Sequence, residues 1–383
     1  MKAPLFPQRN PFPIPEVIPV KLGIVGLPNV GKSTLFNAIT KAGAAAANFP
    51  FCTIEPNVGA VAVPDARLDQ LAVWFQSKKT IPAGVEFVDI AGLVKGASQG
   101  EGLGNKFLSH IRETQAIVHV VRCFEDKDIT HVSGAVDPAS DIEIIETELI
   151  LADLESVEKQ FERLAKKARG GDKEAAHQQE LAHRLKEHLG KGLPARTAGF
   201  TPDEMALVRD FFLISSKPVL YAMNVGEGDL PGMDNAFTAK VREVAAREGA
   251  GAIPICAKIE AEVGELPPEE AQAFLAELGL KEAGLNRLIH AGYDLLGLQS
   301  FYTAGPQEAR AWTIRKGSRA PQAAGEIHSD IERGFIRAEI MSFAQLAEKN
   351  GDEKALKDAG LLRQEGKEYV MADGDIVHFK FNV

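Results

Sequence analysis

The residues best suited to chemistry lie in the stretch GLPNVGKS, residues 26–33, which fits the pattern G-x-x-x-x-G-K-[ST]. Its two glycines let the backbone wrap around a phosphate, so that amides and the start of a helix point inward. We expect Lys32 to act catalytically by reaching the β- and γ-phosphates, and the Ser33 hydroxyl to ligate Mg²⁺. The predicted nucleotide contacts here are Asn29, Val30, Gly31, Lys32, Ser33 and Thr34. The flanking apolar run and helical pattern favour this site over an ordinary glycine turn.

A second motif follows the strand predicted at 85–88. Asp89 and Gly92 form D-x-x-G, in which the Asp orients a Mg²⁺-bound water and the Gly amide meets the γ-phosphate; a tight turn is the alternative. In the preceding loop, Thr53 is the candidate for a second Mg²⁺ ligand, with a solvated hydroxyl as the alternative. Residues 93–104 contain four glycines, and such a segment is costly to order and easy to switch.

The residue after Gly92 bears on hydrolysis. Ras-type switches place a water-orienting Gln there, whereas this chain has Leu93, which cannot orient water. Hydrolysis then needs another group, the backbone or the phosphate itself, or it stays slow until a partner helps. His131 follows the strand predicted at 117–121, on the side where open α/β sheets bind ligands. It is the catalytic candidate, with a surface histidine as the alternative.

A third motif is expected to recognise the base. The strand predicted at 218–223 ends in Asn224-Val225-Gly226-Glu227, where GTPases carry N-K-x-D and pair its Asp with guanine. A fixed carboxylate would repel the N1 acceptor of adenine, whereas the longer Glu227 can point away and leave Asn224 to read the base. This change loosens guanine selection without creating adenine selection. Ala257 lies in a Cys-Ala-Lys sequence that resembles the base-supporting S-A-K loop of GTPases, so guanine remains the alternative base.

The elements that position these motifs alternate between strands and helices, and from residue 141 the pattern changes to long helices. Apolar residues recur there at steps of four and three, as in a coiled-coil seam: Ile150, Leu154, Val157, Phe161, Leu164 and Ala168. Gly170-Gly171 breaks the helix, and Leu181, Leu185 and Leu189 give a returning helix its apolar edge. The sequence therefore predicts an antiparallel helical hairpin that projects from an α/β nucleotide domain.

The outer part of this hairpin is basic, although the whole chain carries a net charge of −10. Its cations are Lys159, Arg163, Lys166, Lys167, Arg169 and Lys173. They form either a solvated helix face or an arm that touches RNA or an acidic partner. Because the net charge argues against bulk nucleic-acid binding, an RNA contact needs such a local patch, and no DNA partner is expected.

The last part of the chain alternates short strands with one helix. Strands are expected at 300–303, 309–314, 335–342 and 375–383, and a helix at 322–333. That order suggests a small β-grasp sheet. The predicted units are an N-terminal extension (1–20), a P-loop nucleotide domain (21–138 and 216–297), a helical coiled-coil insertion (139–215) and a β-grasp domain (298–383).

Composition and cysteine content indicate the compartment in which the protein works. The 383 residues include only three cysteines, Cys52, Cys123 and Cys256, without metal-ligand spacing, which fits free thiols in a reducing compartment. No apolar run approaches membrane-spanning length, and residues 1–20 lack the layout of a signal peptide. We expect a cytoplasmic protein without a membrane partner.

From Lys21 to Val383 the chain resembles the Obg-like ATPase family, also called YchF. The resemblance lies in the P-loop, switch I at 48–57, the glycine-rich switch II at 89–105, and N-x-x-E in place of N-K-x-D; the tail resembles the family's TGS domain. It implies a P-loop core split by a helical insertion, a preference for ATP over GTP, and association with the ribosome. It also implies Mg²⁺ at Ser33 and Thr53, and a hydrophobic residue, here Leu93, in place of the catalytic Gln.

Two further roles come from the resemblance alone. Related proteins use the P-loop Asn, here Asn29, to hold a K⁺ that helps neutralise phosphate charge. Phe124, just past a strand end, has the position of the family's base-packing aromatic, with a core role as the alternative. Residues 1–20 are longer than the family usually needs, and no function is assigned to them.

Together these features predict a Mg²⁺-dependent ATPase, slow without a partner, whose nucleotide state positions the hairpin and tail for the ribosome or ribosomal RNA. One rival is a GTPase, because the base-recognition segment does not by itself select adenine. The other is a ribosome- or RNA-binding adaptor with negligible turnover, since Leu93 is compatible with a bound nucleotide that has only a structural role.

Overall fold

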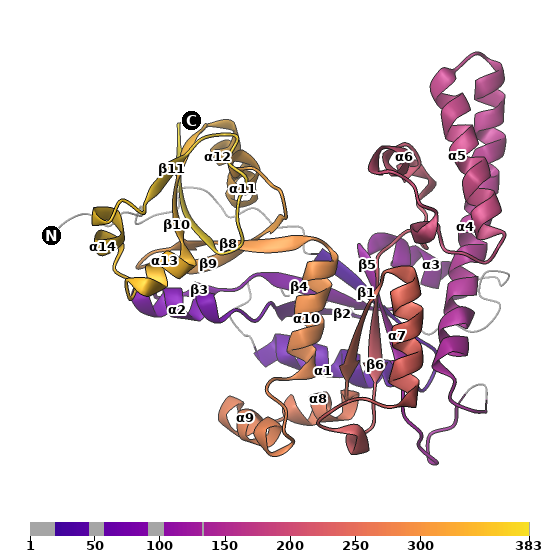
Figure 1. The fold of residues 1–383 in the computed structure, drawn as a ribbon, viewed down its shortest axis with the longest axis horizontal. Coiled ribbons are helices and arrows are strands. Elements are labelled where there is room, and N and C mark those ends of the chain that lie inside the picture. The colour runs from indigo at the N-terminus through magenta and orange to yellow at the C-terminus, as the bar shows by residue number, and fades with distance from the viewer. Residues whose placement is uncertain (1–19, 46–56, 91–102, 132–133, 383) are drawn as a thin grey trace.

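The computed structural model describes residues 20–45, 57–90, 103–131 and 134–382. Its first layer is a six-stranded sheet with the order β2-β4-β1-β5-β6-β7 (Figure 1). The strands are β1 (Val20–Val25), β2 (Val58–Ala62), β4 (Gly84–Asp89), β5 (Ala116–Arg122), β6 (Val219–Asn224) and β7 (Gly251–Ile255). β2 runs antiparallel to β4, and the other pairs are parallel. The strands predicted at 85–88, 117–121 and 218–223 are confirmed.

Helices cover this sheet and connect its parallel strands. Those on the sheet are α1 (Lys32–Ala45), α3 (Leu103–Glu113), α7 (Ala236–Glu248) and α10 (Gly284–Leu295), while α8 (Ala257–Val263) packs against α1 and α9 (Pro268–Glu277) packs against α8. α10 packs against β5, β6 and β7, and both α10 and α7 lie in front of the sheet in Figure 1. Because parallel strands end at one edge, the segments after β1, β4, β5, β6 and β7 meet there. All the described sequence motifs start at this edge.

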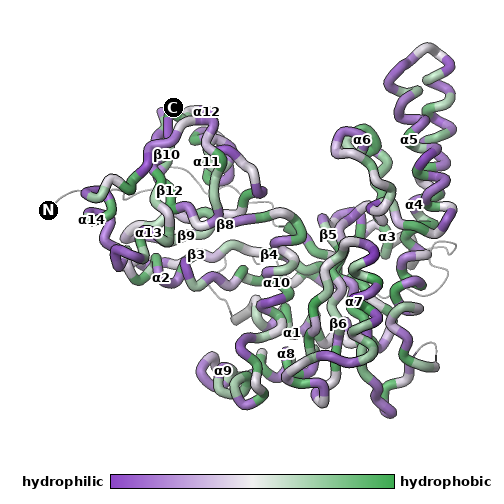
Figure 2. The backbone as a smooth tube through the Cα atoms, viewed as in Figure 1, coloured by the Kyte–Doolittle hydropathy of each residue, from purple (hydrophilic) through white to green (hydrophobic). Residues whose placement is uncertain are grey.

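The predicted hairpin is confirmed as an arm made of α4 (Pro138–Arg169) and α5 (Lys173–Leu189), which projects from the nucleotide domain (Figure 1). Along the predicted seam, Ile150, Val157 and Leu164 are buried, and Leu181 to Leu189 supply the facing edge. In Figure 2 the hydropathy colours alternate along both helices, as expected for helices with one apolar edge. A short helix, α6 (Pro202–Leu207), follows the arm and begins with a capping box at Thr201.

Five strands of the tail and β3, from an earlier part of the chain, form a second six-stranded sheet with the order β11-β10-β12-β8-β9-β3. Its strands are β3 (Thr80–Ile81), β8 (Leu298–Ala304), β9 (Ala309–Arg315), β10 (Phe335–Ser342), β11 (Arg363–Glu365) and β12 (Asp375–Phe381). β12 pairs parallel with β8 between antiparallel neighbours, the arrangement of a β-grasp sheet. Four helices accompany it: α11 (Ala320–Ile327), α12 (Ser329–Arg333), α13 (Phe343–Glu348) and α14 (Glu353–Asp358).

The single helix predicted at 322–333 is wrong. His328 adopts an extended backbone with φ −167° and ψ 140°, which ends α11. Its side chain then accepts a hydrogen bond from the Asp330 amide and caps α12. The sequence has no proline or glycine at this break, so local pattern gives no sign of it.

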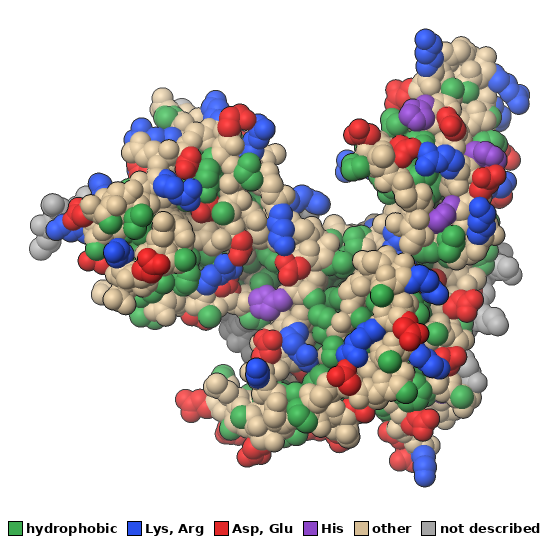
Figure 3. Space-filling model, in the orientation of Figure 1, with side chains coloured by type: hydrophobic (Ala, Val, Ile, Leu, Met, Phe, Trp, Pro, Cys, Tyr) green, Lys and Arg blue, Asp and Glu red, His purple; other side chains and the backbone are tan. Residues whose placement is uncertain are grey.

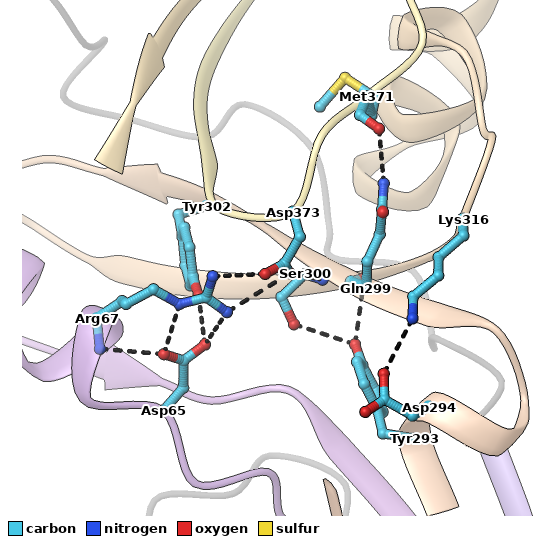
Figure 4. A network of polar contacts seen from close by, with 10 residues as sticks. All are labelled: Asp65, Arg67, Tyr293, Asp294, Gln299, Ser300, Tyr302, Lys316, Met371 and Asp373. Carbon is cyan, nitrogen blue, oxygen red and sulfur yellow. Dashed lines mark hydrogen bonds and ion pairs between the residues drawn. The ribbon is translucent and has the colours of Figure 1, made fainter. Parts of the chain in front are cut away.

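An early segment of the chain joins the tail rather than the first sheet. Between β2 and β4, α2 (Ala66–Trp74) and β3 leave the nucleotide domain, and Thr80 and Ile81 pair parallel with Ala309 and Arg310 of β9. A polar network fastens the same region (Figure 4): the Arg67 guanidinium contacts Asp65 at 2.9 Å and Asp373 at 2.6 Å. Within the described residues, none of the helices has the length and apolar character needed to cross a bilayer.

Candidate nucleotide site

The P-loop turns tightly between β1 and α1. Asn29 and Gly31 have positive φ angles of 65° and 92°. A Cβ on Gly31 would lie 2.2 Å from Asn224 Nδ2, and one on Gly26 would lie 2.8 Å from the Val120 carbonyl oxygen. Both glycines are therefore required by close approach, and at Gly31 by backbone conformation as well.

Lys32 meets the acidic residue of the second motif. Its ammonium forms an ion pair with the Asp89 carboxylate, although 57 positions separate the two residues. β1 and β4 are parallel neighbours, and this pairing brings the start of α1 beside the end of β4. Ser33 and Thr34 follow Lys32 and are exposed in the first turn of α1, where backbone amides are free to bind an anion.

Asn224 joins the base-recognition segment to two other loops. Its Nδ2 donates to the Val30 carbonyl at 2.9 Å, and its Oδ1 accepts from the Ala257 amide at 3.0 Å. Only 4% of Asn224 is exposed, so these bonds form in a dry environment. The side-chain amide carries a second hydrogen, which remains available to an acceptor on a purine.

The two residues that depart from the GTPase pattern have different surroundings. Val225 is 2% exposed, and its amide donates to the Ile255 carbonyl at 2.9 Å, so its side chain belongs to the core. Glu227 is exposed, and its carboxylate pairs with Lys258 at 2.6 Å. This ion pair raises the pKa of Lys258. The carboxylate therefore faces a cation from the neighbouring Cys-Ala-Lys loop.

Phe124 lies against the same segment. A Cβ on Gly226 would lie 3.4 Å from the Phe124 Cβ, so the half-buried ring borders the proposed base site. Arg122 holds this loop: its guanidinium lies 4.7 Å from the Phe124 ring centroid. It also donates to the carbonyls of Phe124, Asp126 and Ile129. Arg122 was not predicted from the sequence, where its only signal is a charged residue at the end of an apolar strand.

His131 is buried and paired. Its Nε2 lies 2.9 Å from an Asp141 carboxylate oxygen near the start of α4, and the two residues are 7% and 2% exposed. Burial raises the pKa of Asp141, and the hydrogen bond from His131 opposes that rise. The preceding carbonyl, of Thr130, accepts from Asn29 Nδ2 at 3.2 Å. The imidazole thus follows directly on a residue that touches the P-loop, but in this structure its Nε2 faces the arm helix.

Most of the residues expected from sequence to contact the nucleotide lie together at this edge of the sheet. Thr53, Gly92 and Leu93 lie outside the described residues. The family also implies Mg²⁺, which prefers oxygen ligands, keeps several waters and takes one or two protein ligands beside phosphate oxygens. The Ser33 hydroxyl, next to Lys32 in the chain, and the Asp89 carboxylate, paired with Lys32, are oxygen ligands of the kind that fit that chemistry.

The fold and this constellation define a P-loop nucleotide-binding protein of the GTPase type. A family model described as "50S ribosome-binding GTPase" matches residues 21–166, and the model YchF-GTPase_C, described as "Protein of unknown function (DUF933)", matches residues 298–382.

Relatives cover almost the whole chain. The "Ribosome-binding ATPase YchF" of Bacillus subtilis (strain 168) is 58% identical over 94% of this chain and 99% of its own length. "Obg-like ATPase 1" of Gallus gallus is 46% identical over 95% of this chain and 92% of its own. The solved "Structure of the Schizosaccharomyces pombe YchF GTPase" superposes with a TM-score of 0.85 at 41% identity, covering 94% of this chain and 97% of that one. The chain belongs to the YchF family of Obg-like ATPases.

Proposed function

We propose that this protein binds ATP with Mg²⁺, hydrolyses it slowly, and associates with the ribosome according to its nucleotide state. The observation that carries the proposal is the junction at Asn224, which bonds the P-loop and the Ala257 loop at once. Beside it, Lys32 contacts Asp89. The segments that we propose bind phosphate, metal and base therefore meet at one edge of the sheet, the arrangement that nucleotide hydrolysis requires.

The ion pair of Glu227, rather than the contacts of Asn224, favours adenine as the base. The remaining Asn224 hydrogen can donate to N7, an acceptor that adenine and guanine share, so this residue does not discriminate between them. Guanine selection in the N-K-x-D pattern depends on a carboxylate that accepts from guanine. Here that role falls to Glu227, whose carboxylate is engaged by Lys258 at 2.6 Å. Pairing with a cation reduces both its attraction for guanine and its repulsion of the adenine N1 lone pair.

His131 is the proposed group that acts on the attacking water. Asp141 can hold its imidazole in one tautomer, as a carboxylate does for a catalytic histidine. Because Nε2 is bonded to Asp141, Nδ1 is the ring nitrogen that we propose acts on the water. Mg²⁺, when bound, neutralises phosphate charge, while Lys32 and the α1 amides orient the phosphates.

A monovalent ion is proposed at Asn29. Its Nδ2 is committed to the Thr130 carbonyl, which leaves its Oδ1 as the kind of ligand that K⁺ accepts. Replacing K⁺ with Na⁺ in a phosphate-release assay tests this role.

Ribosome association is proposed from the names of the relatives and from the basic arm. Figure 3 shows Lys and Arg side chains gathered at the outer end of the arm. We also propose that residues 298–383 form a TGS domain and that the protein works in the cytoplasm. Ribosomal RNA is the proposed contact of the arm, because phosphates complement its cations.

Competition calorimetry with ATP and GTP in Mg²⁺ buffer tests the nucleotide. We expect tighter binding of ATP, whereas tighter GTP binding would make the protein a GTPase. Phosphate release and ribosome co-sedimentation, each measured for the wild type and for Lys32→Ala, test the rest. Absence of wild-type turnover together with unchanged ribosome binding of the variant would identify an adaptor instead.

A further inference from the structure

The base of the arm contains a hollow that the nucleotide site does not use. It has a volume of about 240 Å³ and lies where the end of α3, α6 and residues 208–217 meet. Met205, Val208 and Phe212 give it apolar walls, Arg112, Arg209 and Lys217 line it with positive charge, and no carboxylate is among its lining residues. A half-apolar, cationic hollow suits a ligand that combines a flat apolar part with negative charge.

Phe212 has an unfavourable backbone and an exposed ring. Its φ of 51° and ψ of 45° lie in the left-handed region, and 68% of the residue is exposed. A bulky residue rarely adopts this conformation, because its Cβ comes too close to the following carbonyl oxygen. Because the ring is exposed, it gains little hydrophobic stabilisation to offset the strained backbone. The simplest reason for an aromatic residue here is that it binds a ligand.

The neighbouring residues are held firmly by α4. Asp153, which is fully buried, accepts hydrogen bonds from the Ile214 and Ser215 amides at 2.7 Å and from the Ser215 hydroxyl at 2.6 Å. On the other side of Phe212, the Ser156 hydroxyl donates to the Phe211 carbonyl at 3.0 Å. Because both flanks are fixed, the ring is presented at the hollow without further ordering, which lowers the entropy cost of binding.

The cations around the ring are available. Arg112 and Arg209 are exposed, and within the described part of the chain neither forms an ion pair with a carboxylate. Lys217 Nζ donates to the carbonyls of Arg112 and Thr114, which leaves one of its three hydrogens, and burial lowers its pKa. Arg112 lies in the last turn of α3, so the hollow receives positive charge from α3 as well as from residues 208–217.

We propose that this hollow binds one unpaired nucleotide of a single-stranded RNA segment, with the base stacked on Phe212 and the flanking phosphates on Arg112, Arg209 and Lys217. Single-stranded nucleic acid is held in this way, by an aromatic platform beside a cationic track. The guanidinium groups match phosphate, and the exposed ring face matches a planar base better than a peptide side chain. The choice of RNA rests on the proposed association with the ribosome.

Fluorescence anisotropy of the full-length protein with a labelled adenosine octaribonucleotide tests the site. Phe212→Asn removes the ring but suits a left-handed backbone, so it should melt at or above the wild-type temperature while binding RNA roughly tenfold more weakly. Phe212→Tyr keeps a stacking face and should bind like the wild type. Arg209→Gln should reduce the salt dependence of binding by roughly one unit of slope, whereas Lys281→Gln, an exposed cation far from the arm, should not.

An octamer with abasic positions serves as the matched probe, and a Glu-rich peptide containing Phe represents a protein partner. We expect the abasic octamer to bind both the wild type and Phe212→Asn with the same weak affinity. Equal RNA affinity of wild type and Phe212→Asn, equal affinity for the two octamers, or a peptide that binds more tightly than RNA would each overturn the proposal. Phosphate release from ATP, measured on the same samples, tests the proposed function separately, because none of the residues proposed for the nucleotide site lines the hollow.

Discussion

Gly31 is the residue of the P-loop with the least freedom to change. Gly31→Ala places a methyl group at a φ of 92° and 2.2 Å from Asn224 Nδ2, so Asn224 must move and release Val30 or Ala257. We expect MgATP affinity to fall at least tenfold in calorimetry, with about 1–3 kcal/mol lost from the free energy of unfolding.

Gly171→Ala is the matched control for that substitution. Gly171 has nearly the same φ, 90°, in the turn of the arm, and nothing lies within 4 Å of an added Cβ. It should lose similar backbone stability without losing ATP affinity. Equal nucleotide affinity in the two variants would mean that the contact with Asn224 does not shape the site.

His119 makes the stability of the core depend on pH. Burial, together with the charge of Arg196, lowers the pKa of His119 from 6.5 to about 3. Between these values the unfolded chain binds a proton that the folded protein excludes, so the free energy of unfolding falls as the pH drops. His119→Phe, which keeps a ring against Tyr221, should be within about 1 kcal/mol of the wild type at pH 7 and about 2 kcal/mol more stable at pH 5. Urea unfolding of both proteins at each pH measures the difference, and parallel pH profiles would contradict the assignment.

Among the elements, the arm is joined to the nucleotide domain by a buried cluster. The Arg196 guanidinium contacts Glu146 on α4 and Glu248 on α7, the latter at 2.6 Å, and the Tyr221 hydroxyl donates to Glu248 at 2.8 Å. Burial is the main cause that raises the pKa of Glu146, against the opposing charge of Arg196.

Arg196→Met should therefore lower the free energy of unfolding by about 3–5 kcal/mol, because it leaves two largely buried carboxylates without their cation. Adding Glu146→Gln to that variant should restore part of the loss, whereas Glu146→Gln alone should cost less. Chemical denaturation of the two single variants and the double variant completes the cycle. Additive losses would show that the two residues do not act as a pair.

Sequence patterns could predict the elements that carry a short functional motif. Lys32, Asp89 and Asn224 each follow an apolar strand within a short motif, so spacing alone placed them at one edge of a sheet. The pairing of β3 with β9 could not be predicted, because two residues of strand carry no periodicity and their partners lie over 200 positions away. Arg122 was missed for a related reason: it acts through backbone carbonyls, which leave no trace in the types of the residues that supply them.

At the scale of the whole molecule, α4 connects the nucleotide site to the outer end of the arm. It begins at Pro138, carries Asp141 beside His131, and runs for 32 residues, about 48 Å at 1.5 Å per residue. A rotation of a few degrees at its base would move the far end by several ångströms. The contact between His131 and Asp141 is thus placed to pass a change at the phosphates to a distant surface.

Asp141→Asn tests this connection while keeping the shape of the side chain. It removes the charge that holds His131, so we expect phosphate release to fall severalfold and the ratio of ribosome affinities with ATP and ADP to approach one, with ATP affinity unchanged. Asp137→Asn, at the exposed start of α4 where Asp137 pairs with Lys240 at 3.2 Å, is the matched control and should keep that ratio. Co-sedimentation with each nucleotide measures it. If Asp141→Asn kept the wild-type ratio while its turnover fell, the pair would serve catalysis alone, and the arm would respond to the nucleotide by another route.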